Sequence, residues 1–172
     1  TVTPTRPVGG TCGNRIIETA LGETCDDGNT IDNDGCPSNC RIAPCTASGQ
    51  RLRVNVNFAT DDPELFVQTM LLFLRYPDGT LDVPGVGDSL PVQAAVTSDI
   101  FAVTPRDFDY AVRVLLEDPT LLGYTDGTAV TVAFDVCQGA SAPPLSAIAC
   151  TVESAGDPNF VEIPAGRIAC AL

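Results

Sequence analysis

A chain of 172 residues with 44% hydrophobic residues is long enough to bury the core of one β-domain and to carry a small appendage. Its 22 acidic and 9 basic residues give a net charge of -13, which excludes nucleic acid and anionic membrane surfaces as partners because both would be repelled. Histidine and tryptophan are absent, so the commonest general base, the commonest transition-metal ligand and the best sugar-stacking ring are missing.

The number and spacing of the cysteines indicate the cellular compartment in which the protein works. The 8 cysteines form an even set without histidine and without paired CxxC knuckles, which favours disulfides over a zinc site. We therefore expect an extracellular or cell-surface protein. The densest apolar run, Met70–Leu74, has only the length of a strand, so no membrane insertion is expected.

The first segment, residues 1–11, is rich in threonine and proline and ends in two glycines. This composition predicts an extended arm or linker. An alternative is that Thr1–Val8 docks on an exposed sheet edge of a neighbouring copy, where an extended chain donates main-chain hydrogen bonds. Pro4 and Pro7 restrict such a strand to an edge position.

Residues 12–45 hold five of the cysteines and few apolar residues, so disulfides and a bound cation must supply the stability that a hydrophobic core does not. The segment contains six carboxylates and two arginines. Hard oxygen ligands at short irregular spacing, with glycines for tight turns, are typical of calcium sites. The order of residues is not that of an EF-hand loop. The alternative is that these Asp and Asn residues cap turns in solvent.

The string CGN…E…GE-x-CDDGN…DGC…C resembles the acidic cysteine-rich repeat of bacterial secreted and surface proteins, a domain of unknown function, and distantly the calcium-binding Notch-type repeats. Arg15 and Asn33 stand where that repeat commonly has glycine, and Asn33 tolerates a left-handed backbone. The long spacing from Glu18 to Cys25 leaves the role of Glu23 open. With this resemblance, the motif predicts calcium ligands at Asn14, Glu18, Asp26, Asp27, Asp32 and Asp34, with Asn29 as a second choice.

From residue 46 onward the pattern changes to alternating apolar and polar residues, clearest in Arg51–Phe58. Val67–Tyr76 is apolar on both faces and predicts a central strand. Short strands separated by turn signals predict a mainly β fold, an antiparallel β-sandwich over residues 46–172. Further strands are expected at 110–116, 130–136, 148–152 and 168–172, and helical turns at 61–66 and 106–110.

The disulfide expectations divide the cysteines into two groups of four. Cys12, Cys25, Cys36 and Cys40 belong to the repeat, and their three possible pairings stay open. Cys150 and Cys170 share the inward phase of two alternating strands, so we expect them to pair, which leaves Cys45 with Cys137.

The larger domain begins with a long strand and contains the turn at Arg75–Gly79, the segments Tyr110–Arg113 and Phe134–Cys137, and two late cysteines. In these features it resembles the cohesin-like β-sandwich domains that accompany such repeats in bacterial extracellular proteins. Cohesins bind a dockerin partner through one sheet face. No residue of this sequence marks that face, so the resemblance implies a fold and no partner.

We do not expect an enzyme, because a serine or cysteine nucleophile would lack its usual base and every cysteine has a predicted disulfide partner. The acidic pairs Asp61–Asp62 and Asp107–Asp109 are predicted to be solvated loops and not glycosidase carboxylates. The favoured function is a calcium-stabilised structural subunit that self-associates into an extracellular fibre or surface layer, in which calcium holds the repeat against its neighbour. Alternatives are a monomeric adhesion or display module and a module for surface glycans, with Tyr76 and Tyr124 as the candidate sugar platform.

Overall fold

A computed structural model describes residues 12–26, 28–31, 36–108 and 111–172. The chain forms two compact units, which divide between Ala43 and Pro44. This division lies two residues before the predicted boundary and places Cys45 with the β-domain. The predicted arm, residues 1–11, lies outside the described residues. No helix in the described part of the chain is long and apolar enough to cross a membrane.

The first unit is built around its cysteines. Its one element in the described ranges is the 3-10 helix η1 (Thr19–Leu21). Cys25, Cys36 and Cys40 are buried, whereas Ile16 and Ile31 are 61% and 64% exposed. Among the residues described in this unit, the buried apolar side chains are these cysteines, which therefore supply its interior.

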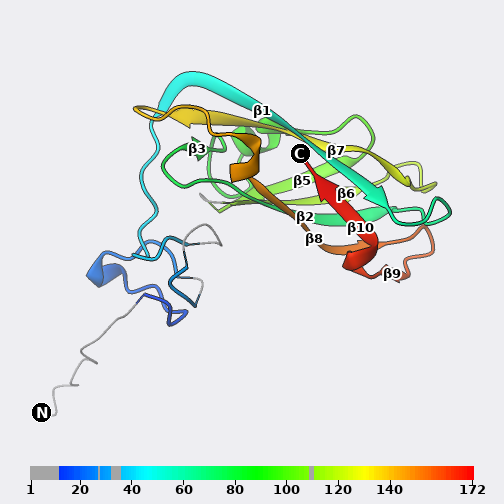
Figure 1. Cartoon of the computed structure of the whole chain (residues 1–172), viewed down its shortest axis with the longest axis horizontal. Coiled ribbons are helices and arrows are strands. Elements are labelled where there is room, and N and C mark those ends of the chain that lie inside the picture. Colours follow the sequence, from blue (N-terminus) through cyan, green and yellow to red (C-terminus); the bar gives the residue numbers. More distant parts are fainter. Residues whose placement is uncertain (1–11, 27, 32–35, 109–110) are drawn as a thin grey trace, which may run out of the picture. The chain divides into compact units, whose positions relative to one another are not determined.

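The second unit is a sandwich of two antiparallel sheets. The first sheet has the order β10-β1-β7-β3, and β4 also pairs with β7. Its strands are β1 (Ala47–Thr60), β3 (Leu81–Asp82), β4 (Val96–Thr97), β7 (Asp126–Cys137) and β10 (Ile168–Ala171). Figure 1 shows β1 and β7 running side by side in one layer.

The second sheet has the order β5-β6-β2-β8-β9. Its strands are β2 (Thr69–Arg75), β5 (Ala102–Asp107), β6 (Ala111–Glu117), β8 (Ala149–Gly156) and β9 (Glu162–Ile163). The predicted central position of β2 is confirmed. The predicted helical turn at 106–110 is wrong where it is described, because Arg106 and Asp107 continue β5 in register with β6.

Alternating side chains from both sheets fill the space between the layers. Val54 pairs with Val132 in one sheet and Leu72 with Val114 in the other, and all four are at most 1% exposed. Burial of each such side chain contributes roughly 1.5–3 kcal/mol to folding. The short helix α1 (Leu90–Ala95) adds Val92 to this core. The 3-10 helices η2 (Leu145–Ala147) and η3 (Ala165–Arg167) lead into β8 and β10.

Candidate functional sites

The carboxylate of Asp26 organises the first unit. Its Oδ2 accepts the backbone N–H groups of Gly13 at 2.9 Å and Asn14 at 3.1 Å, and its Oδ1 accepts those of Arg15 at 3.0 Å and Gly28 at 2.9 Å. Desolvation raises the pKa of Asp26, but the four N–H donors outweigh it and hold the pKa below the ordinary value. Four bonds occupy the lone pairs of both oxygens, so Asp26 ties the loop after Cys12 to the loop after Cys25.

This arrangement depends on left-handed backbone at three positions. Gly13, Arg15 and Gly28 have φ values of 95°, 67° and 96°. A Cβ atom at Gly28 would lie 2.5 Å from Nε of Arg15, so a larger residue there would have to displace the Arg15 side chain and adopt a strained backbone. Glycine is expected from the sequence resemblance at the position of Arg15, and the positive φ of Arg15 is a conformation that suits glycine.

Two further carboxylates meet beside Asp26. Glu23 is 8% exposed, and its Oε2 accepts the backbone N–H of Glu18 at 2.7 Å. Oε1 of Glu18 accepts the side-chain amide of Asn14 at 3.0 Å. Oε2 of Glu18 is buried and accepts no hydrogen bond from any described residue. The backbone bond lowers the pKa of Glu23, but the neighbouring Glu18 carboxylate, desolvation and the charge of Asp26 together raise it above its ordinary value.

The chemistry of this group fits a hard cation. Two carboxylates in contact, one of them with a buried oxygen that accepts no hydrogen bond among the described residues, are stabilised by a shared proton or by a cation between them. Glu23, Asp26 and Cys40 have potential ligand atoms within 4.8 Å of one another, but the sulfur of Cys40 is in a disulfide and offers no thiolate. Because backbone N–H groups occupy the oxygens of Asp26, the donors that remain are the carboxylates of Glu18 and Glu23, which are of the kind calcium prefers.

The structure brings together only part of the predicted ligand set. Asn14, Glu18 and Asp26 converge, and Glu23 joins them. Oδ1 of Asn14 accepts the N–H of Ile16, and Oδ1 of Asn29 accepts that of Ile31, so both also form local turns. Three predicted ligands lie outside the described residues: Asp27, Asp32 and Asp34. The sequence did contain a feature that could have identified Glu23 as a ligand, because Glu23 is the glutamate in the GE-x-C part of the motif.

Four disulfides link all 8 cysteines. In the repeat, Cys12 pairs with Cys40 and Cys25 with Cys36, a nested arrangement that decides among the three open pairings. In the sandwich, Cys45 pairs with Cys137 and Cys150 with Cys170, the two pairs expected from the sequence. Disulfides of this number are typical of proteins from oxidising compartments.

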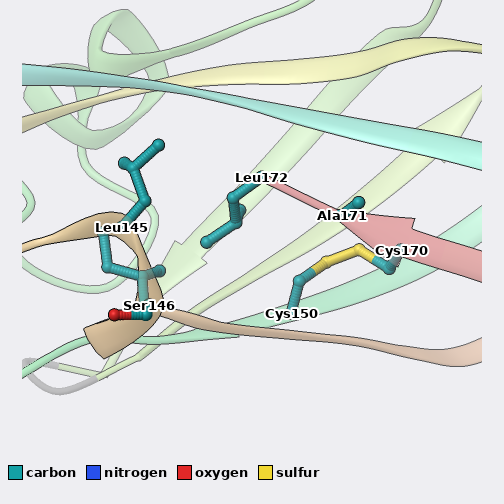
Figure 2. Close-up of a pocket in the computed structure, with 7 residues that line it drawn as sticks. Leu145, Ser146, Cys150, Cys170, Ala171 and Leu172 are labelled. Carbon is teal, nitrogen blue, oxygen red and sulfur yellow. A yellow bond between two sulfur atoms is a disulfide. The ribbon is translucent and has the colours of Figure 1, made fainter.

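A shallow apolar depression of about 280 Å³ adjoins the Cys150–Cys170 disulfide. Leu145 and Leu172 border it, and Ser146 and Ala171 complete the rim (Figure 2). It has no charged lining residue.

The outer face of the second sheet carries arginines and phenylalanines, which we call the Arg–Phe face: Phe73, Arg75, Arg106, Phe108 and Arg113. The rings of Phe73 and Phe108 lie 6.4 Å apart. The guanidinium of Arg75 lies 4.9 Å from the centre of the Phe73 ring, and that of Arg106 lies 5.4 Å from the centre of the Phe108 ring. A hollow of about 230 Å³ is lined by Phe73, Phe108, Arg113 and Glu153.

Strand register creates this face. Arg113 on β6 lies opposite Phe73 on β2 and opposite Arg106 on β5. Directly opposed like charges are unfavourable unless an anion balances them. Glu153 on β8 supplies one carboxylate, to which Arg113 donates at 2.7 Å. Three of the 9 basic residues of an acidic chain thus gather on one sheet face, and Arg113 pairs there with Glu153.

The aromatic residues singled out in the sequence lie elsewhere. Tyr76 is 3% exposed, and its hydroxyl donates to Oδ1 of Asp107 at 2.7 Å. Tyr124 packs edge-on against Phe101, with ring centres 5.5 Å apart. Tyr76 is therefore not an accessible sugar platform, and the expectation for it is wrong. The half-buried Phe73 and Phe108 were missed because their outward phase in β2 and at the end of β5 depends on the strand boundaries.

The acidic pairs considered for catalysis are held in structural contacts. Asp61 and Asp62 form ion pairs with Arg167 at 2.9 and 3.3 Å. Asp107 is 4% exposed and accepts the hydroxyl of Tyr76. Asp109 lies outside the described residues. Asp61, Asp62 and Asp107 line neither of the two hollows described above.

Comparison with known proteins gives similarity in fold. No family model and no curated protein matches the chain. The sixth cohesin of scaffoldin B from Acetivibrio cellulolyticus, solved with a Cel5 dockerin, has a TM-score of 0.46 and 18% identity over 70% of this chain and 85% of that one. The Coh-OlpA–Doc918 complex, a type I cohesin–dockerin pair from Clostridium thermocellum, has a TM-score of 0.41 and 18% identity over 69% and 84%. A complex of CaDoc0917 with CaCohA2 has a TM-score of 0.44 and 20% identity over 69% and 85%. The chain is thus similar to cohesins, and the sandwich assignment itself follows from the strand order and buried faces given above.

Proposed function

We propose that this protein is an extracellular, calcium-stabilised structural module that binds an acidic protein partner through its Arg–Phe face. The observation that carries the proposal is the gathering of Arg75, Arg106 and Arg113 around Phe73 and Phe108 on an exposed sheet face. Arginine and aromatic residues are the types that dominate binding energy in protein interfaces.

The charge balance selects the class of partner. The chain as a whole has a net charge of -13, so a polyanion such as nucleic acid is repelled over most of the surface. A compact partner that places a few carboxylates on the face meets the guanidinium groups of Arg75, Arg106 and Arg113, of which Arg113 is paired with Glu153. Arginine forms bidentate hydrogen bonds with carboxylates and stacks on rings, so it suits a surface that is partly apolar.

Calcium has a stabilising role in this proposal and no catalytic one. Glu18 and Glu23 would hold the ion, since Oε2 of Glu18 is buried and unsatisfied among described residues and Glu23 lies beside it. The predicted ligands Asp27, Asp32 and Asp34 are candidates to complete the oxygen shell. A bound divalent cation would remove the repulsion between the carboxylates and favour the folded repeat.

Self-assembly into a fibre or surface layer remains the proposed use of the module, with a monomeric display or glycan-binding module as the alternative. A head-to-tail contact between copies forms an open filament when its rotation does not close into a ring. Negative-stain microscopy with calcium, and again after chelation with EGTA, tests whether the ion takes part in assembly. Filaments that dissolve on chelation support a contact made through the repeat. Absence of binding to the glycans of an array would exclude the glycan-binding alternative.

The Arg–Phe face is tested by titrating the 15N-labelled protein with an acidic peptide, acetyl-Glu-Phe-Glu-Leu-Glu-amide, and with its glutamine analogue. We expect chemical-shift changes confined to β2, β5, β6 and β8, weaker at high salt and absent with the analogue. Changing Arg106→Gln together with Arg113→Gln should weaken binding at least tenfold. Arg51→Gln is the matched control, because Arg51 is an exposed arginine of the other sheet in an ion pair with Asp135. Shifts outside this face, or equal losses in the control, would contradict the proposal.

A further inference from the structure

An exposed apolar surface lies on three loops of the sandwich and is used by neither site described above. We call it the apolar tip, and its residues are Phe66, Leu121, Leu122, Phe160 and Val161. Leu122 is 75% exposed and Phe160 is 76% exposed. Single exposed apolar residues are ordinary, but a group of five on adjoining loops is typical of an interaction surface.

The three loops are packed against one another. A Cβ atom at Gly123 would lie 2.8 Å from Cβ of Phe66 and 3.2 Å from Cγ of Pro158. The loop after β1, the loop after β6 and the loop after β8 therefore meet at this glycine. The apolar tip is consequently one continuous part of the sandwich, built from segments far apart in the sequence.

Hydrogen bonds hold the apolar side chains outward. The buried Asp118 carboxylate accepts the N–H groups of Leu122 at 3.0 Å and Gly123 at 2.7 Å. Leu121 and Phe160 have φ values of 60° and 62°, a conformation that bulky residues rarely adopt. Such backbone persists only where the surroundings enforce it, so these loops present a preformed surface.

The apolar tip and the Arg–Phe face lie at opposite ends of β2. Gln68, just before β2, donates its N–H to the carbonyl of Gly156 and accepts the N–H of Asp118, which places the tip loops at the start of the strand. Phe73 and Arg75 occupy its end. One copy therefore cannot bring its own two surfaces together, whereas two copies can.

The two surfaces are complementary in charge. The loop after β1 carries Asp61, Asp62 and Glu64, the loop after β8 carries Asp157, and Glu162 begins β9 next to Val161. Arg167 forms ion pairs with Asp61 and Asp62, so Glu64, Asp157 and Glu162 are the further carboxylates near the tip. The apolar tip is thus bordered by carboxylates, whereas the Arg–Phe face combines aromatic rings with arginines. Contact between the two surfaces would bury phenylalanine and leucine side chains against one another. It would also place carboxylates of the tip near guanidinium groups of the Arg–Phe face.

We propose that the apolar tip of one copy docks on the Arg–Phe face of a second copy. This inference rests on the proposed function, because it names the partner of the same face. Each copy offers one surface of each kind, so the contact is head-to-tail and repeats along a chain of copies. The small size of both surfaces sets a dissociation constant on the order of micromolar to millimolar for one contact.

Two variants that each lose one surface test this arrangement in sedimentation velocity. The tip variant carries Leu122→Asp and Phe160→Asp, and aspartate tolerates the left-handed backbone at 160. The face variant carries Arg75→Glu, Arg106→Glu and Arg113→Glu. The control carries Val86→Asp and Leu90→Asp, which change two exposed apolar residues, 68% and 78% exposed, outside both surfaces. Circular dichroism and thermal melting confirm that each variant is folded.

We expect the unchanged protein and the control to form a concentration-dependent series of oligomers. Each variant alone should be monomeric, with self-association weakened at least tenfold. An equal mixture of the two variants should form a heterodimer and nothing larger, because only one pair of intact surfaces is left. A monomeric unchanged protein at millimolar concentration, a mixture that stays monomeric, or a tip variant that still assembles would each overturn the inference. If the acidic peptide still binds the face in any of these cases, the proposed function stands and only the second copy as partner is rejected.

Discussion

Asp118 is 1% exposed, and its Oδ2 accepts the backbone N–H of Gly123 at 2.7 Å. The same carboxylate accepts the hydroxyl and the N–H of Thr120 and the N–H of Leu122. One buried side chain thus closes the loop between β6 and β7 and determines which side chains that loop exposes.

Removal of the Asp118 charge should destabilise the sandwich. Asp118→Asn replaces one acceptor oxygen with an amide that faces N–H donors, so we expect a loss of about 1–3 kcal/mol in the free energy of unfolding. Denaturant unfolding measures the change. Asp126→Asn is the control, because Asp126 is exposed at the start of β7. Equal effects of the two changes would contradict the structural role of Asp118.

The pKa of Asp118 predicts how this contribution varies with pH. Desolvation raises the pKa, but the hydrogen bonds from Thr120, Gly123 and Leu122 lower it below the ordinary value of 3.8. The folded state therefore binds a proton less readily than the unfolded state, and the stabilisation is fully present above pH 3.8. It is lost as the pH falls through the lowered pKa. The stability difference between the unchanged protein and Asp118→Asn should shrink over that acidic range, as measured by denaturant unfolding at a series of pH values.

The two disulfides of the sandwich should differ in their contribution to stability. Cys45 and Cys137 are 92 residues apart, whereas Cys150 and Cys170 are 20 apart. Loop entropy predicts that replacing the first pair by alanines costs about 4.6 kcal/mol and the second about 3.3 kcal/mol. Chemical unfolding of the two double variants measures both values. The reverse order would show that native-state packing around Cys150 and Cys170 outweighs loop entropy.

Calcium binding should depend on Glu18 and Glu23. Isothermal titration after chelation should show binding at millimolar calcium or below, and Glu18→Gln or Glu23→Gln should weaken it because each removes a charged oxygen donor. Glu64→Gln, at an exposed position of the β-domain, should leave binding unchanged. Absence of heat with the unchanged protein would remove calcium from the proposed function.

Arg15→Gly should leave the repeat intact and raise its stability by about 0.5–1 kcal/mol. The φ of Arg15 is 67°, which glycine adopts without a steric penalty, although the freedom of glycine in the unfolded chain offsets part of the gain. Its N–H, which binds Asp26, is retained. Arg15→Val should destabilise instead, since a β-branched residue is poorly accommodated at positive φ. Thermal unfolding of the two variants at fixed calcium distinguishes these outcomes.

Residue patterns alone determined the larger elements and two of the disulfides. Strict alternation in Arg51–Phe58 and the doubly apolar stretch at Val67–Tyr76 predicted β1 and the central strand β2, because a period of two is a local property of the chain. The shared phase of Cys150 and Cys170 predicted their pairing in the same way. The acidic motif likewise placed Glu18 and Asp26 in one candidate site.

Tertiary structure decided what the side chains of these elements do. The burial of Tyr76 and the partly exposed position of Phe73, three residues earlier in the chain, depend on where β2 ends and on which sheet face meets the other layer. Arg106 and Arg113 become neighbours only through the register of β5 with β6. Glu18, Glu23 and Asp26 come together because Asp26 collects four backbone N–H groups from two loops and Glu23 accepts the backbone N–H of Glu18. Such contacts join residues distant in sequence, so no local period encodes them, and strand pairing and loop closure alone set which charges and rings the surface presents.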